Sequence, residues 1–542
     1  MLKNREAAKM LENIVGLDNF SEDPVILSSY TFVPFAYIYP LIEGSTPKDI
    51  WDRAKLGAVI MPRSTEEVQM IVKVCNRYKI NFKAFSTGMG AWGMPIKEGS
   101  LQVDMRRMNK IIELDDKNMY AVVESYVSHR ELAVEASKKG LTCHVIGAGS
   151  QTSVLASLTS QEGTGHDSLT TGHSARNCIG AEWVTPTGEV VKWGLVEKGK
   201  AGYPGPGLSG IYRGWIGALG GLGIFTKAAV KLYPWPGPPQ LEMTGKNPTP
   251  GYKIPENFKI YLLGLPSAEA IANAIYRLTE TQIAYHAWLF PLFFHPQRWM
   301  GESNDDHYEI WKNLQAAGVI EKSFNQLTVI LSAYSEKELS YKQKVMEDII
   351  KEIGAQEFLP EFLTEHDKER FFCAQIAVNK PCTEFRTGGG EMGTSNGAAL
   401  TWDINMKMKN AIFRMQKKYI DENVLTDFAG ETCWGGPIEQ RAMGHTEFVH
   451  FTNPRNAELR KRQAEFVRET VEFAKREKWL GQAPYVIKKI GMDKERLSPF
   501  LGDYFDYKRK IKEALDPDNV ADATIYIGCL LYTSPSPRDR QK

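Results

Sequence analysis

The sequence predicts an α+β protein with two main domains. Runs with strand-like and helix-like apolar spacing alternate along most of the chain, as they do in mixed α and β folds. A proline cluster at Pro234–Pro239 separates a glycine-rich first half from a second half with longer helical runs. Stretch 147–172 is rich in Gly, Ser and Thr, and so long a segment inside a compact domain is usually either functional or disordered.

These features divide the chain into five segments. They are an N-terminal helical segment, a glycine-rich first domain, a second domain of alternating strands and helices, a C-terminal segment of short mixed elements, and a tail. The tail is proline-punctuated and polar, so we expect it to be a non-native appendage or a disordered end. The five segments are residues 1–50, 51–237, 238–480, 481–528 and 529–542.

The composition is that of an ordinary globular protein. Of 542 residues, 43% are hydrophobic and 24% are charged, and the formal net charge of +1 gives no reason to expect a nucleic-acid partner. No apolar run approaches the ~18 residues of a membrane span. None of the seven cysteines falls in a CxxC pair, which argues against a metal or iron–sulfur site and fits reduced thiols in a cytoplasmic protein.

Apolar periodicity places helices and strands in the first domain. Residues 64–79 predict a helix that Ser64 or Thr65 can cap, and residues 128–139 predict a second helix that ends at Gly140. A turn at Asp115–Asn118 is expected between two of the strands, and Thr187–Gly188 is expected to turn a hairpin. The predicted strands are 58–62, 80–86, 101–105 and 120–127, and the hairpin is 181–193.

The second domain shows a different pattern. Strand-like runs alternate with long helical runs, and an antiparallel sheet is the natural expectation for this arrangement. The strands are predicted at 259–265 and 327–334, and the helices at 267–282, 335–354 and 455–479.

A glycine-rich turn, Ser86–Gly93, follows one of the strands of the first domain. Glycines allow positive φ and close approach of a ligand, and successive backbone N–H groups can bind a diphosphate. The spacing GxGxxG occurs here, but Pro95 follows at once, so the turn does not open a helix as a Rossmann fingerprint must. Alone, such a turn is equally consistent with an ordinary structural turn.

Several stretches in fixed order are more specific than this turn. They are the strand–helix–strand unit with its glycine loop (58–93), the strand and helix at 120–141, the Gly/Ser/Thr-rich loop (147–172), 180–194 and 207–234. In this order the chain resembles the FAD-binding domain of the vanillyl-alcohol oxidase / p-cresol methylhydroxylase family, which also includes D-lactate and glycolate dehydrogenases. The resemblance covers about residues 55–237, with a further match at 509–522. It implies a PCMH-type FAD-binding domain of two subdomains under an α+β cap.

The resemblance assigns cofactor contacts to matched positions. The diphosphate loop would be Ser86, Thr87, Gly88, Met89, Gly90 and Ala91. The flavin would lie along Ser153, Val154, Leu155, Gly163 and Gly165, with tight turns at Gly172 and Gly180. The adenine end would meet Gly223, Ile224 and Thr226.

Three departures from the family pattern refine this expectation. Some relatives tether FAD through a histidine in the diphosphate loop, where this chain has Met89. Others use a histidine or tyrosine of the second domain, near His445, in a loosely aligned region. We therefore expect non-covalent FAD. Phenol-oxidising relatives carry an arginine where this chain has Asp506, which argues against a phenolic substrate.

Candidate catalytic residues follow from the chemistry of flavin enzymes, which often need a base or an electrostatic anchor near the substrate. His173 falls in the flavin-facing loop by the resemblance, and a structural histidine is the alternative. Arg386 could anchor a carboxylate or form a surface ion pair. His445 is the third candidate, and its metal-binding role with His450 is disfavoured because their spacing places them on opposite faces of a strand. Further candidates are His166 and Asp167 in the same loop, and Trp402 and Trp434, which could line a pocket or simply fill the core.

Two functional hypotheses result. The first is an FAD-dependent dehydrogenase or oxidase that takes a hydride from a small alcohol, hydroxy acid or benzylic compound. Its electron acceptor stays open among dioxygen, a quinone, an electron-transfer flavoprotein and a partner iron–sulfur subunit, and a homo-oligomer is allowed. The second is a flavin-binding relay or non-catalytic subunit of a larger redox complex.

Overall fold

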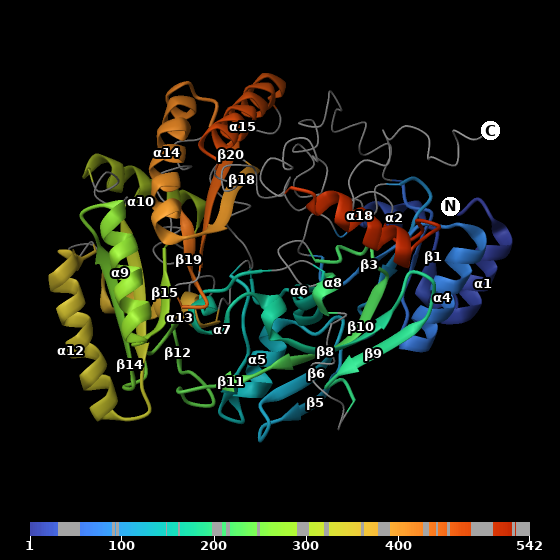
Figure 1. The fold of residues 1–542 in the computed structure, drawn as a ribbon, viewed down its shortest axis with the longest axis horizontal. Helices are drawn as coiled ribbons and strands as arrows, with labels where there is room; N and C mark the ends of the chain where they lie inside the picture. Colours follow the sequence, from blue (N-terminus) through green and yellow to red (C-terminus); the bar gives the residue numbers. More distant parts are fainter. Residues whose placement is uncertain are drawn as a thin grey trace.

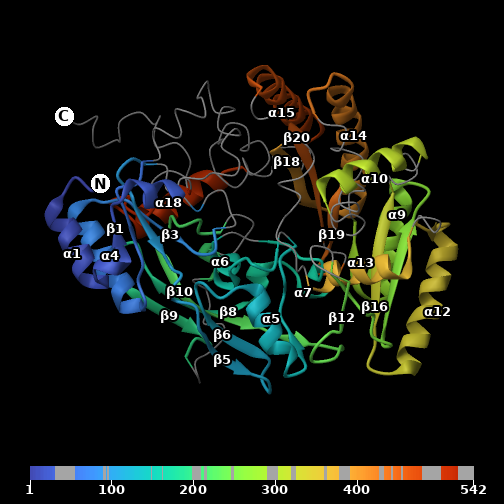
Figure 2. The same cartoon turned by 180° about the vertical axis from the view of Figure 1, so that it is seen from behind.

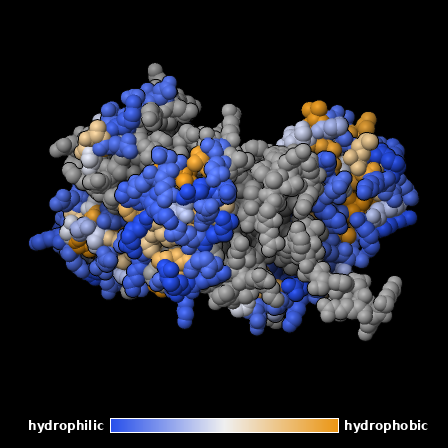
Figure 3. Space-filling view, turned by 90° about the horizontal axis from the view of Figure 1, so that it is seen from above, coloured by the Kyte–Doolittle hydropathy of each residue, from blue (hydrophilic) through white to orange (hydrophobic). Residues whose placement is uncertain are grey.

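The computed structural model contains two regions side by side, with the C-terminal helix lying back on the first (Figure 1). Apolar residues form small separate patches on a mostly hydrophilic surface when the molecule is seen from above (Figure 3). Within the described residues, no helix is long and apolar enough to cross a membrane. The structure describes residues 1–30, 55–88, 93, 97–147, 149–160, 163–197, 209–212, 217–245, 250–289, 303–318, 325–358, 363–377, 391–425, 433–440, 443–452, 456–478, 502–522 and 526.

The first sheet has the strand order β1-β2-β4-β3, and β2, β4 and β3 are parallel. Helix α4 begins after Ser64, whose hydroxyl accepts the N–H of Glu67, as predicted for this cap. Its apolar face packs with α1 in one core beneath the sheet. The elements are α1 (Arg5–Val15), β1 (Phe20–Ser21), α2 (Pro24–Ser29), β2 (Ala58–Ile60), α4 (Thr65–Tyr78), β3 (Phe82–Phe85) and β4 (Leu101–Asp104).

The second sheet is antiparallel throughout, in the order β5-β6-β10-β8-β9. The predicted hairpin is confirmed, because Val184 pairs with Val190 across a turn in which Gly188 has φ +89°. One expectation was wrong: strand 101–105 does not flank the turn at Asp115–Asn118 but joins the first sheet. The strands are β5 (Ile111–Asp115), β6 (Tyr120–Glu124), β8 (Cys178–Val184), β9 (Val190–Gly194) and β10 (Ile224–Lys231).

The Gly/Ser/Thr-rich stretch is partly helical, which its sequence did not indicate. Its helices are too short for a helical period to show, since none exceeds six residues. The stretch begins after α5, which a capping box between Ser128 and Glu131 starts. The elements are α5 (His129–Ser137), β7 (Leu141–Thr142), α6 (Val154–Thr159), α7 (Ser168–Thr171), η3 (Ser174–Asn177), α8 (Ser209–Tyr212) and β11 (Tyr233–Pro234).

The described part of the cap contains two larger antiparallel sheets, as expected from the alternation of strands and helices, and a two-stranded one, β12-β13. The first has the order β15-β16-β14-β17, with α9 and α12 on one face, and the second has the order β18-β20-β19 (Figure 2). Its elements are β12 (Met243–Thr244), β13 (Gly251–Tyr252), β14 (Phe258–Gly264), α9 (Ala268–Thr281), β15 (Ala284–Trp288), α10 (Asn304–Ala316), β16 (Gln326–Ser332), α12 (Glu336–Ile353), β17 (Gln356–Glu357), α13 (Glu365–Ala377), β18 (Glu391–Leu400), α14 (Trp402–Asp421), β19 (Trp434–Ile438), β20 (Met443–Thr452) and α15 (Ala457–Glu477).

The C-terminal segment returns to the first sheet. After α18 (Tyr504–Leu515), the chain turns and lies parallel to β3. The N–H of Phe82 donates to the carbonyl of Val520 at 3.0 Å, and the N–H of Asp522 donates to the carbonyl of Phe82 at 2.9 Å. The ammonium of Lys83 lies 2.8 Å from the carboxylate of Asp522, and both side chains are buried. Two backbone bonds and one buried ion pair therefore fasten this segment to the strand that leads into the glycine-rich turn.

Candidate cofactor and active site

The start of the predicted diphosphate loop meets the start of α6. Strand β3 leads into Ser86, Thr87 and Gly88, and Gly88 has φ +73°, a conformation that favours glycine. The hydroxyl of Thr87 accepts the N–H of Ser153 at 3.1 Å, and Ser153 caps the helix that begins at Val154. Two segments that are far apart in the sequence, and that the resemblance assigns to the cofactor, are thus in contact. Met89, Gly90 and Ala91 lie outside the described residues.

Glycines along the predicted flavin segment are required by close packing. A Cβ on Gly163 would lie 2.5 Å from the side chain of Ile146, and one on Gly165 would lie 2.1 Å from the carbonyl oxygen of Val145. Gly172 has φ +73°, and a Cβ there would lie 2.8 Å from a carboxylate oxygen of Glu439 in the cap. Gly165 and Gly172 therefore require glycine whether or not a ligand is bound, whereas at Gly163 the end of the Ile146 side chain would have to move.

Four further predicted cofactor residues, which lie in or beside the strands of the second sheet, are closely packed by the protein itself. Ile224 is buried in the core of the first subdomain. The hydroxyl of Thr226 is bonded to the buried carboxylate of Glu182 at 2.9 Å. Gly180 and Gly223 lie where a Cβ would strike backbone atoms of neighbouring strands or turns. Contacts of these four residues with the adenine end or the flavin remain a prediction and would have to use the backbone.

The flavin-segment loop is docked on the cap. The N–H groups of Glu439 and Gln440 donate to the carbonyls of Ser168 and Leu169 at 3.0 and 2.8 Å. Arg176 forms an ion pair with Glu439 at 2.8 Å. The side chain of Leu169 is part of the cap core. His173 lies in this docked segment, directly before η3, and is 5% exposed. The candidate base is therefore buried near the contact between the first region and the cap.

Four aromatic side chains meet where this loop contacts the cap, and we call them the His–Trp cluster: His166, Trp288, Trp434 and His445. The ring of His166 lies 5.2 Å from Trp288 and 6.0 Å from Trp434, centroid to centroid. Trp434 in turn lies 4.9 Å from Trp288 and 5.3 Å from His445. The two tryptophans and His445 come from β15, β19 and β20 of the cap. The ring of Trp434 is thus in contact with both His445 and His166.

Several buried polar atoms around this cluster lack protein partners. Among the described residues, the side-chain amide nitrogen and oxygen of Gln375 and the indole N–H of Trp288 have no hydrogen-bond partner. Gln375 is 1% exposed, and its backbone carbonyl lies 3.4 Å from the Nδ1 atom of His166. Unsatisfied polar groups of this kind are rare in native proteins, and a water, an ion or a functional role commonly accounts for them. The surroundings of the cluster are therefore suited to a polar ligand.

Buried histidines extend from the cluster into the loop. The Nδ1 atom of His144 lies 2.9 Å from the carboxylate of Asp167. Burial raises the pKa of Asp167, but the neighbouring His144 outweighs this effect and holds the pKa below its usual value. Burial lowers the pKa of His286 to about 4, although Asp167 opposes the shift. Burial, assisted by His144, lowers the pKa of His129 to about 3.

We expect stability to fall between pH 6.5 and 4 because of these histidines. The unfolded chain binds protons near the ordinary histidine pKa of ~6.5, whereas folded His286 and His129 stay neutral to lower pH. Each pH unit below ~6.5 therefore costs up to about 1.4 kcal/mol for each such histidine. Urea unfolding at several pH values tests this. His286→Asn should flatten the pH dependence, whereas His366→Asn, at a partly exposed position, should not; equal slopes would contradict the assignment.

Substitution of Gly147 should disturb the His–Trp cluster. A Cβ at this position would lie 2.3 Å from the ring of Trp434 and 3.3 Å from His166. Gly147→Ala is therefore expected to displace Trp434 and to lower the free energy of unfolding by about 1–3 kcal/mol. Gly210→Ala is the matched control, because no atom lies within 4 Å of a Cβ there. Equal stability of the two variants in urea would show that Trp434 is not confined as described.

The sequence candidates are only partly brought together. His445 and His166 meet in the cluster, and Asp167 pairs with His144. Arg386 lies outside the described residues. Trp402 is part of the cap core, which is the simpler of the two interpretations of this residue. Trp434 lies in the His–Trp cluster. Among the described residues no group of three or more His, Cys, Asp or Glu side chains could hold a metal.

Some residues of the cluster region were missed in the sequence. His286 and Trp288 alternate along β15 and are both buried, a period-two pattern in AYHAW that could have been noticed. No sequence signal singles out Gln375, which lies in an ordinary helical run.

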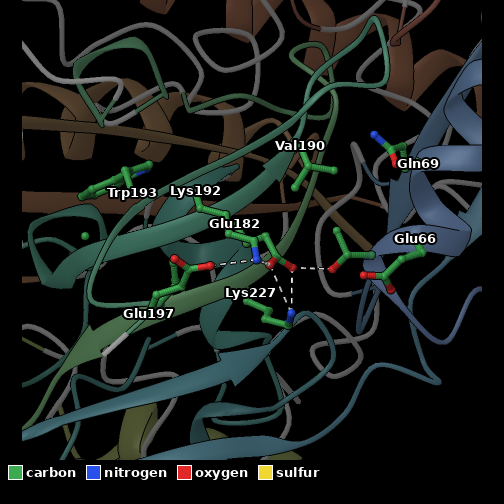
Figure 4. Close-up of a pocket in the computed structure, with 11 residues that line it drawn as sticks. Glu66, Gln69, Glu182, Val190, Lys192, Trp193, Glu197 and Lys227 are labelled. Carbon is green, nitrogen blue, oxygen red and sulfur yellow. Dashed lines mark hydrogen bonds and ion pairs between the residues drawn. The ribbon is translucent and has the colours of Figure 1, made fainter. Parts of the chain in front are cut away.

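An open cleft of about 800 Å³ lies elsewhere, between α4 and strands β8–β10 (Figure 4). The carboxylate of Glu182 forms its floor and accepts the hydroxyl of Thr226, and Lys227 and Lys192 lie 2.9 and 3.3 Å from it. These three charges are therefore paired within the protein. It is separate from the contact between Thr87 and Ser153.

Comparison with known proteins identifies an FAD binding domain in the first half of the chain. Residues 57–194 match the model of an FAD binding domain. The glycolate oxidase subunit GlcD of Bacillus subtilis is 29% identical over 181 residues, which cover 33% of this chain and 37% of the relative. The 4-cresol dehydrogenase (hydroxylating) flavoprotein subunit of Pseudomonas putida is 28% identical over 226 residues, which cover 40% and 41%. The chain therefore contains an FAD binding domain, and the relatives that it resembles are FAD-linked oxidoreductases.

The fold agrees over nearly the whole chain. The structure of p-cresol methylhydroxylase with substrate bound has a TM-score of 0.71 and 17% identity, and the match covers 98% of both chains. The 4-ethylphenol oxidase of Gulosibacter chungangensis has a TM-score of 0.66 and 19% identity, over 96% and 97% of the two chains. FAD is the cofactor, and the PCMH-type fold with an α+β cap is confirmed. The curated relatives are matched over less than half of their length, so substrate and partners are matters for proposal.

Proposed function

We propose that this flavoprotein oxidises a small alcohol, hydroxy acid or benzylic compound held between the FAD domain and the cap. FAD, when bound, supplies the acceptor for the substrate hydride, and the protein supplies position and electrostatics. The observation that carries the proposal is the His–Trp cluster at the contact of the two regions. It places two tryptophan rings next to buried polar groups, and residues of these types line many small-molecule sites.

We assign His173 as the group that takes the proton from the substrate. Its support is its buried position in the docked segment, together with the role that the resemblance implies for this position. His445 and Arg386 are proposed to orient the substrate or the cofactor, through hydrogen bonds and through a bidentate contact with a carboxylate respectively. The binding of FAD is proposed to be non-covalent. Several classes of compound could accept the electrons of the reduced flavin, and a partner redox protein is one of these candidates.

Anaerobic reduction by a panel of compounds tests the function. The purified holoprotein is mixed without oxygen with aliphatic alcohols, 2-hydroxy acids and benzylic alcohols, and its flavin absorbance near ~450 nm is followed. We expect one class to bleach the flavin and the others to leave it oxidised. If no compound bleaches a flavin that dithionite reduces normally, the chain acts instead as an electron relay or a non-catalytic subunit.

A further inference from the structure

Five charged side chains are buried where α18 returns to β3. Lys83 pairs with Asp522 at 2.8 Å, and Lys512 pairs with Asp516 at 2.5 Å. Lys508, one helical turn before Lys512, is also buried and is 3% exposed. Its ammonium has no hydrogen-bond partner among the described residues. This group therefore contains three lysines and only two carboxylates.

The excess lysine is poorly compensated by the protein. A buried ammonium without an anion carries a desolvation cost. The ammonium of Lys508 lies 4.0 Å from the centroid of the Tyr526 ring, and such a contact offsets only part of the cost of removing the charge from water. Burial lowers the pKa of Lys508 to about 7, although the charge of Asp522 opposes the shift. The side chain is thus ready to take a full positive charge when an anion approaches.

The excess lysine lies toward the end of β3 from which the diphosphate loop begins. Residues Val520 to Asp522 run parallel to β3, since Ala521 pairs with Phe82. The ammonium of Lys512 binds the carbonyl of Ala521, whereas Lys508, one helical turn earlier in α18, lies beside Tyr526. Tyr526 packs on Gly221, where a Cβ would lie 2.2 Å from it. From Lys512 to Lys508, α18 therefore follows β3 toward the turn at Ser86–Gly88.

We propose that Lys508 carries the positive charge that balances the diphosphate of the bound cofactor. The inference rests on FAD as the cofactor and concerns how this chain holds it. The glycine-rich loop supplies backbone dipoles, and the described residues Ser86, Thr87 and Gly88 carry no charge. A buried cation nearby would supply the opposite charge that a doubly negative diphosphate favours.

The proposal predicts a pH dependence of FAD affinity. The diphosphate would favour the charged form of Lys508, so FAD binding takes up a proton above pH 7 and weakens as pH rises. The other charged groups near Lys508 are held in pairs, Lys83 with Asp522 and Lys512 with Asp516. Burial raises the pKa of Tyr526, so its phenol stays neutral over the same range. The pH dependence of the Kd for FAD should therefore follow the titration of Lys508.

The test compares FAD binding by the deflavinated full-length chain, measured by quenching of flavin fluorescence between pH 6.5 and 9. We expect the wild-type Kd to rise by up to about tenfold per pH unit above pH 7. Lys508→Met should bind FAD at least about tenfold more weakly at pH 6.5, with no such rise. Lys508→Arg, which keeps its charge, should bind tightly at all these pH values. Lys510→Met, an exposed position on the same helix, is the matched control.

Competing ligands separate the possible sources of the anion. ADP should displace FAD from wild type better than from Lys508→Met, whereas adenosine should compete equally with both. The proposal is overturned if Lys508→Met matches Lys510→Met in Kd and in pH dependence, or if inorganic diphosphate stabilises only the wild type while FAD binding is the same in both. If Lys508→Met does not fold, the pH dependence of FAD binding by Lys508→Arg still tests the proposal: pH-independent binding supports it, and the wild-type rise in Kd contradicts it. A wild-type chain that binds no FAD at any pH would instead refute the flavin function.

Discussion

Asp522→Asn is expected to lower the free energy of unfolding by about 3–5 kcal/mol. The substitution leaves the ammonium of Lys83 buried without its anion, and Lys83 is only 2% exposed. It also removes the carboxylate that supports the charge of Lys508. Because Asp522 belongs to the segment paired with β3, we expect that segment to detach first. Urea unfolding of the apoprotein measures the change.

Asp518→Asn is the matched control for this prediction. Asp518 lies four residues earlier in the same returning segment and pairs with Lys79, but both side chains of that pair are about half exposed. An exposed pair contributes only about 0–1 kcal/mol. If the two variants unfold at the same urea concentration, the buried pair does not fasten the C-terminal segment as described.

His173→Asn is expected to slow substrate-driven reduction of the flavin by about 100- to 10,000-fold, the usual contribution of a positioned base. Asparagine has a similar size and keeps a polar side chain in the buried segment, but it cannot accept the substrate proton. Binding of FAD and the rate of reduction by dithionite should not change. Anaerobic stopped-flow absorbance with the substrate class found by the panel measures the rate.

A histidine outside the contact between the two regions controls for the loss of an imidazole as such. His366 lies on α13 beside Glu369 and is partly exposed, so His366→Asn should reduce its flavin at the wild-type rate. A wild-type rate in His173→Asn would remove this residue from the proposed chemistry and would shift attention to His166 and His445 in the His–Trp cluster.

The secondary structure of the FAD domain could be predicted where residues close together in the sequence determine it. Ser64 before α4 and Gly188 in the β8–β9 turn act through nearest neighbours, and both expectations were confirmed. The partner of strand 101–105 could not be predicted, because strand pairing is set by packing between distant segments. The helices after Ser153 were missed since each spans less than two turns.

The candidate site was predictable only through order and resemblance. Thr87 and Ser153, which the resemblance assigns to one cofactor site, are in contact although 66 positions separate them. Gln375 and Lys508 could not have been singled out from the sequence. What distinguishes each of them is a buried side-chain polar atom without a hydrogen-bond partner, and only the structure shows this. In the sequence one is an ordinary helix residue and the other belongs to a basic run, YKRKIK, that would usually face solvent.

The content of bound flavin tests the central claim most directly. Purified protein is precipitated with acid, and the flavin in the supernatant and in the pellet is identified by chromatography and absorbance near ~370 and ~450 nm. We predict about one FAD per folded chain, released into the supernatant because no covalent bond holds it. Absence of FAD from both fractions, in protein that also fails to bind added FAD, would contradict the account.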